Sequence, residues 1–167
     1  MRHTFFVLVV LTLGFAGRAW AVSDADFVEK AAMAGMTEVE LGRHASEHAA
    51  SPAVRAFGQK MVADHSKANA ELSAIAEKQG ISVPAAMDDQ HRKEVAKLTG
   101  KHGSDFDEAY MKMMVADHKD VLAEFRTQAK EGKTEVDRFA AKTLPTLESH
   151  LNQAKSVKAS LKKHASR

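Results

Sequence analysis

The sequence predicts an all-α protein in which four long helices form one bundle. Three observations support this fold class. The composition is rich in Ala, Leu, Lys and Glu and poor in aromatic residues, as in helical proteins. Four segments repeat apolar residues at spacings of three and four. Each segment also begins at a residue typical of a helix start. The helices are expected at 24–49, 52–79, 105–131 and 135–162.

Residues 1–21 are expected to be a secretory signal peptide rather than part of the fold. Basic residues at the start precede a short apolar run, and Ala19-Trp20-Ala21 has the pattern of a signal peptidase site. The alternative is an uncleaved membrane anchor, but the run is shorter than the roughly 18–20 residues of a span. We therefore expect cleavage after Ala21, a periplasmic location, and one domain over 22–167 without an integral membrane span.

The charge balance argues against a nucleic-acid partner. The chain has 24 Lys and Arg residues against 22 Asp and Glu residues. Loss of Arg2 and Arg18 with the leader makes the two counts equal, and no clustered basic face is evident. Cysteine is absent, so no disulfide stabilises the exported chain. Packing, or a bound metal, must supply the stability.

The first two helices are expected to form an antiparallel hairpin. Ser23 with Asp26 three residues later is a capping-box arrangement at the start of the first helix. Ser51 followed by Pro52 predicts the start of the second helix, because proline suits the first helical position. Gly80 is a natural end for that helix. The link between the two helices is only a few residues long.

The last two helices are expected to form a second hairpin. Ser104 with Asp107 predicts the start of one, and Thr134 with Asp137 the start of the other. The segment between the hairpins is much longer and contains a possible short helix at 88–98. A connection of this length can cross the whole bundle. It therefore favours a ferritin-like four-helix bundle over a simple up-and-down one.

Each apolar stripe is interrupted near its middle by one polar residue. These residues are Glu38, His65, His118 and His150. Glu38 and His65 each lie ~20 Å from the link between their helices, at about 1.5 Å per residue. The corresponding heights of His118 and His150 differ by ~3 Å. All four side chains can therefore share one layer of the core.

Three imidazoles and one carboxylate are suitable ligands for a transition metal such as Zn, Cu or Fe. The predicted metal ligands are thus Glu38, His65, His118 and His150. The alternative is a hydrogen-bonded polar layer without metal, with Glu38 accepting from the histidines and waters filling the rest.

The stretch MVADH occurs twice, at 61–65 and at 114–118, and places an aspartate beside two of these histidines. Asp64 and Asp117 point about 100° away from the neighbouring histidine on the same helix. Each is expected to orient an imidazole from the next helix, as partners of metal-bound histidines do. The alternative for both is a salt bridge with a lysine.

Five motifs resemble those of one known family. They are EVELG at 38–42, MVADHSKAN at 61–69, GSDFDEAY at 103–110, the second MVADH, and TLPTLESHL at 143–151. The chain resembles the exported bacterial ferritin-like bundle proteins catalogued as domain of unknown function 4142, over about residues 24–157. The resemblance implies a ferritin-like fold and an envelope location. It places all six predicted site residues on the family's polar motif positions, and it implies no settled activity.

The sequence thus leads to an exported bundle that binds a transition metal, in metal handling or envelope stress protection. The alternative is a structural or interaction bundle without metal. The Glu-x-x-His spacing of di-iron bundles is absent, which favours a mononuclear, histidine-rich site over iron oxidation. The sequence indicates neither a substrate pocket nor a second metal, so it gives an enzyme little support. It identifies no protein partner.

Overall fold

A computed structural model describes residues 23–165 of the chain. The predicted signal peptide and its cleavage site lie outside the described residues. Within 23–165 the protein has five helices and no strand. They are α1 (Asp24–His48), α2 (Pro52–Lys78), α3 (Asp89–Thr99), α4 (Gly103–Ala129) and α5 (Glu135–Ala165). None of the described helices has the length and apolar character that a membrane span requires.

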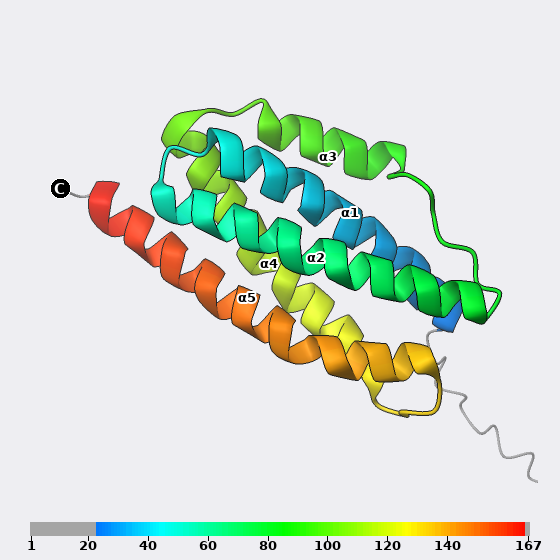
Figure 1. Cartoon of the computed structure of the whole chain (residues 1–167). Helices are drawn as coiled ribbons and strands as arrows, with labels where there is room; N and C mark the ends of the chain where they lie inside the picture. Colours follow the sequence, from blue (N-terminus) through cyan, green and yellow to red (C-terminus); the bar gives the residue numbers. More distant parts are fainter. Residues whose placement is uncertain (1–22, 166–167) are drawn as a thin grey trace, which may run out of the picture.

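The four long helices form two antiparallel hairpins, α1–α2 and α4–α5 (Figure 1). The connection through α3 runs back along the outside of the bundle. As a result, α2 and α4 point in the same direction (Figure 1). Helix α3 packs against α1 and α4. The predicted ferritin-like bundle with a long crossover and a short helix within it is therefore confirmed.

Two of the predicted helix starts have the expected capping geometry. The side chain of Ser23 accepts a hydrogen bond from the Asp26 amide at 3.1 Å. At the start of α5, the Thr134 hydroxyl accepts from the Asp137 amide at 3.0 Å, and the Asp137 carboxylate accepts from the Thr134 amide at 3.0 Å. Both caps join residues three apart, so they satisfy free amides of the first turn without help from the rest of the fold.

Helix α2 begins at Pro52 with Ser51 at its N-cap, as predicted, whereas the predicted cap of α4 is wrong. Helix α4 begins at Gly103, and the Asp107 carboxylate does not cap it. Instead Asp107, which is buried, accepts from the backbone amides of Ala50 and Ser51 at 3.1 and 2.7 Å. The Ser51 side chain makes no capping hydrogen bond. A carboxylate from the second hairpin thus satisfies the turn of the first.

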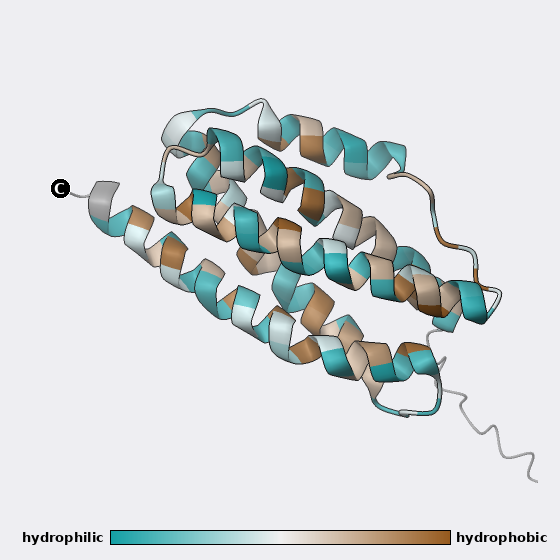
Figure 2. Ribbon diagram, viewed as in Figure 1, coloured by the Kyte–Doolittle hydropathy of each residue, from teal (hydrophilic) through white to brown (hydrophobic). Residues whose placement is uncertain are grey.

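The apolar core has two parts, and the polar layer lies between them. One part gathers near the α1–α2 turn and includes Phe57, Phe106 and Tyr110. The other lies toward the α4–α5 turn and includes Phe27 and Phe139. Figure 2 shows apolar and polar residues interleaved along every helix, as amphipathic packing requires.

Helices α1 and α2 approach closely at a pair of glycines beside the polar layer. A Cβ atom at Gly58 would lie 2.7 Å from the carbonyl oxygen of Gly42 and 2.9 Å from the Cβ of Ala45. Only a residue without a side chain fits there. This contact fixes how α1 lies against α2 one to two turns away from Glu38 and His65.

Candidate metal-binding site

The four polar residues of the helix stripes meet inside the bundle. Glu38 comes from α1, His65 from α2, His118 from α4 and His150 from α5, and all four are buried. One nitrogen from each imidazole lies within 4.8 Å of the chosen nitrogens of the other two. The ring centroids are 5.2–5.8 Å apart. The sequence therefore placed all four side chains in one layer correctly.

The rings of His118 and His150 are each held from the outside. His118 Nδ1 lies 2.9 Å from the carbonyl oxygen of Met114, and His150 Nε2 lies 2.7 Å from Asp64 Oδ2. A carbonyl and an ionised carboxylate only accept hydrogen bonds, so these two nitrogens carry the protons. In the neutral rings His118 Nε2 and His150 Nδ1 are then both acceptors. They face each other at 3.4 Å.

His65 is held in a similar way by Glu38. Its Nδ1 lies 3.0 Å from Glu38 Oε2, and its Nε2 is buried without a hydrogen-bond partner among the described residues. Three imidazole nitrogens, His65 Nε2, His118 Nε2 and His150 Nδ1, are thus left without a hydrogen-bond donor. The opposite nitrogen of each ring is fixed by a carboxylate or a carbonyl, which is the usual arrangement around a metal-bound histidine.

The electrostatics of the layer keep two of the rings neutral. Burial lowers the pKa of His150 to about 4, and burial also lowers the pKa of His118. Burial opposes the charged form of His65 too, but the charge of Glu38 and its hydrogen bond raise the pKa of that ring. Burial would raise the pKa of Glu38, yet the three histidines lower it to about 2. An ionised carboxylate and neutral imidazoles are the forms that bind metals.

Glu38 occupies a different place from the one expected of a direct ligand. Its carboxylate lies on the Nδ1 side of both His65 and His118, with Oε1 3.4 Å from His118 Nδ1. It is not one of the three residues whose ligand atoms converge. The carboxylate is drawn to the ring nitrogens that face α1. In this geometry Glu38 supports two imidazoles, and its direct binding of a metal stays a prediction.

The two aspartates of the MVADH repeats have different surroundings. Asp64 contacts an imidazole from another helix, His150, as expected, and it also pairs with Lys60 at 2.7 Å. Asp117 makes no hydrogen bond to an imidazole among residues 23–165, contrary to expectation. Asp117 lies on the side of α4 that faces α1 and α3, and neither of these helices carries one of the three histidines of the layer. Burial, then the charges of Glu38, Glu94 and Asp120, raise the pKa of Asp117 to about 7.

The sequence did not indicate a pocket that reaches this layer. A pocket of about 220 Å³ lies between α1, α3 and α4, and Glu38 and Asp117 are among its lining residues. Helix α3 contributes His91 and Glu94. The only feature of the sequence that relates to this pocket is the set of acidic residues on α3 and α4. These residues indicate a pocket only once the position of α3 against α1 is known.

The fold and the layer define an all-α bundle with a buried three-histidine cluster. The chain matches the family described as "Domain of unknown function (DUF4142)" over residues 14–157, and it belongs to that family. This confirms the resemblance of its motifs. Among solved structures it is similar to a DUF305 fragment from Deinococcus radiodurans, with a TM-score of 0.68 at 15% identity. The match covers 81% of this chain and 95% of that one, and at this identity it shows the fold alone. No curated protein matched the chain.

Proposed function

We propose that this protein is an exported bundle that binds one transition-metal ion through His65, His118 and His150. Glu38 and Asp64 hold two of the rings in place. The observation that carries the proposal is the convergence of three imidazole nitrogens whose opposite ring nitrogens are already fixed. Convergence of free nitrogens on one point is what a metal requires, and imidazole suits Zn, Cu or Fe.

The alternative is a hydrogen-bonded polar layer without metal. It accounts for the contacts of Glu38 with His65 and of Asp64 with His150. Contacts among the side chains alone leave two imidazole acceptors facing each other in the core and one buried nitrogen without a partner among the described residues, so in this alternative water must fill the rest of the layer. Buried polar atoms are nearly always hydrogen-bonded, and an ion would satisfy all three nitrogens together. For this reason metal binding is the better-supported function.

The role we propose is metal handling or envelope stress protection, rather than catalysis. The site lies inside the core, and two of its three rings have no exposed surface. A periplasmic location follows from the predicted leader. It is tested by fractionating cells that express the complete gene and measuring the mass of the purified protein. A chain that begins at Val22 supports export, and a chain that begins at Met1 in the cytoplasm contradicts it.

Metal binding is tested by thermal unfolding of chelator-treated protein with Zn²⁺, Cu²⁺ or Fe²⁺ added in turn. A ligand that binds only the folded state stabilises it by about 2.7 kcal/mol at a concentration of 100 Kd. We expect at least one metal to raise the Tm of the wild type and not of His118→Ala. The control is His48→Ala, which removes an exposed imidazole outside the layer. Identical melting of the wild type with and without every metal would refute the proposal.

Glu38→Gln distinguishes the two roles that Glu38 can have. The amide keeps the size of the side chain but not its charge. If Glu38 supports His65, the variant binds the metal more weakly with the same set of nitrogen ligands. If Glu38 is itself a ligand, X-ray absorption of the bound metal loses an oxygen neighbour in the variant. That result would contradict the supporting role and restore the ligand set expected from the sequence.

A further inference from the structure

The proposed metal site has no direct opening to the solvent. The side chains of His118 and His150 are fully buried, and His65 is nearly so. An ion can reach the three nitrogens only by passing another side chain that contacts them. Two acidic residues contact the rings from a side that borders the solvent: Glu38, which lines a pocket beside α1, and Asp64, which is partly exposed where α2 meets α5.

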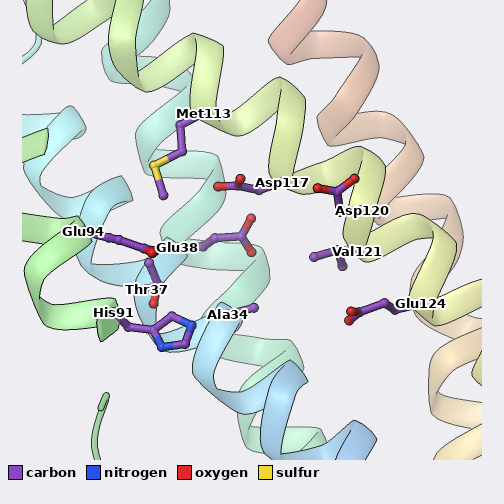
Figure 3. Close-up of a pocket in the computed structure, with 10 residues that line it drawn as sticks. All are labelled: Ala34, Thr37, Glu38, His91, Glu94, Met113, Asp117, Asp120, Val121 and Glu124. Carbon is purple, nitrogen blue, oxygen red and sulfur yellow. The ribbon is translucent and has the colours of Figure 1, made fainter. Parts of the chain in front are cut away.

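Glu38 lies at the inner end of the pocket between α1, α3 and α4. Six of the residues that line this pocket are titratable, and five of these are acidic: Glu38, Glu94, Asp117, Asp120 and Glu124, with His91 as the sixth. No lysine or arginine of the described part of the chain lines it. In Figure 3 the carboxylates of Glu38 and Asp117 extend into the same space, with His91 and Glu94 entering from α3. A cleft with one sign of charge attracts ions of the opposite sign.

Glu38 links this pocket to the imidazoles. Its side chain is buried, with a relative exposure of 4%, and it still lines the pocket. Oxygen Oε2 contacts His65, while Oε1 lies 3.4 Å from His118 Nδ1 and makes no hydrogen bond among the described residues. A buried carboxylate oxygen without a donor is an available ligand for a cation. The same side chain therefore faces the pocket and touches the first imidazole beyond it.

The acidic residues of the pocket do not form a cage. Among residues 23–165 the three histidines are the group of potential ligands whose atoms converge, and the pocket carboxylates are not part of such a group. Separated carboxylates raise the local concentration of cations without binding one tightly. The pocket is thus suited to passage rather than storage.

The alternative way in, beside Asp64, carries an unfavourable charge. Asp64 is partly exposed and contacts His150, but the Lys60 ammonium lies 2.7 Å from the same carboxylate oxygen. This lysine neutralises the aspartate and repels an approaching cation.

We propose that the acidic pocket between α1, α3 and α4 is the entrance through which a divalent metal cation reaches the three imidazoles by way of Glu38. This inference rests on the proposed metal-binding function. It names a route and a charge type for the ligand. It also assigns a role to Glu94, Asp117 and Asp120, which make no hydrogen bond to the three imidazoles within residues 23–165.

The test measures the rate of metal binding rather than its strength. Metal-free protein is mixed with Co²⁺ or Zn²⁺ in a stopped-flow instrument, for the wild type and for Glu94→Gln/Asp120→Asn. Both residues are exposed and outside the proposed ligands, so the double variant is expected to fold. Electrostatic steering changes association rates by 10-fold to 10³-fold. We expect the association rate to fall about tenfold and to lose most of its dependence on salt.

The equilibrium affinity supplies the second measurement. Because the two variant residues lie on the route and not at the site, dissociation should slow as well, and the affinity should stay within about threefold of the wild type. The control is Glu77→Gln/Glu135→Gln, which removes the same charge from exposed positions that do not line the pocket. This control should bind at the wild-type rate.

Three results would overturn the inference, and they differ from failure of the proposed function. Binding by the pocket variant at the wild-type rate would exclude this entrance. An equal slowing in the control would show a general charge effect. Faster binding in Lys60→Gln, without an effect of the pocket variant, would place the entrance beside Asp64. If the wild type binds no metal, the proposed function fails and the entrance fails with it.

Discussion

Mild acid should destabilise the metal-free protein because His150 is held neutral in the core. Burial lowers the pKa of this ring to about 4, from 6.5 in the unfolded chain. Between these two pH values the unfolded chain binds a proton that the folded protein does not. Stability therefore falls as the pH falls through this window. One pKa unit corresponds to about 1.36 kcal/mol, so the total loss from His150 is about 3 kcal/mol.

The other two imidazoles also make the stability depend on pH, and they act in opposite directions. His118 also has a lowered pKa and acts in the same direction as His150. His65 has a raised pKa, so its contribution is fully present below pH 6.5 and is lost as the pH rises through the raised value. The pKa of Glu38 is lowered from 4.5 to about 2, so its contribution is lost between these two pH values, mostly below the window of His150.

The assay is urea unfolding of chelator-treated protein, followed by circular dichroism, at several values between about pH 7 and pH 4. His150→Gln keeps a donor for Asp64 but removes the titrating ring. We expect this variant to be less stable at neutral pH and to lose about 3 kcal/mol less than the wild type across the window. An exposed-histidine control, His48→Gln, should follow the wild type. Parallel curves for the wild type and His150→Gln would refute the assignment of a neutral, buried His150.

Three further predictions concern the framework around the site. Asp107→Ala removes the acceptor of two amides in the α1–α2 turn and should lower the free energy of unfolding by about 2–4 kcal/mol, whereas the exposed Asp105→Ala should change it little. Gly58→Ala gains about 1 kcal/mol of helix propensity, but the added methyl group forces α1 and α2 apart. We therefore expect a lower free energy of unfolding and weaker metal binding. A variant that is more stable than the wild type would contradict the close contact. Tyr110→Phe removes a buried hydroxyl without a partner among the described residues, so stability should stay constant or rise by up to about 1 kcal/mol, and a clear loss would reveal a partner.

The sequence predicted most of the fold because helix boundaries are local features. Ser23 and Thr134 cap their helices through residues three positions away, and the link lengths determine which helices form hairpins. The start of α4 was misplaced because Asp107 bonds to a turn more than 50 residues earlier. The direction of α2 relative to α4 also could not be derived, since the four polar residues lie near the helix centres and meet in either arrangement.

The candidate site was predicted in part for similar reasons. The positions of the three histidines follow from the periodicity of the stripes, which each helix carries by itself. The surroundings of the two aspartates do not, because Asp64 and Asp117 occur in the same MVADH motif. Asp64 lies beside the helix that carries His150, whereas Asp117 faces the α1–α3 side. Identical local sequences therefore have different partners, and only the packing of the hairpins decides between them.

The energetics of the layer give a reason to prefer a ligand over a purely structural role. Four ionisable side chains lie between the two apolar clusters of the core. Replacing a buried ionic group by apolar residues of similar size is often neutral or stabilising. The side-chain contacts among the described residues also leave His65 Nε2 without a partner and place two acceptors, His118 Nε2 and His150 Nδ1, against each other. Stability alone is therefore a poor explanation for these residues, whereas a cation at the three nitrogens would turn each unfavourable feature into a metal–ligand bond.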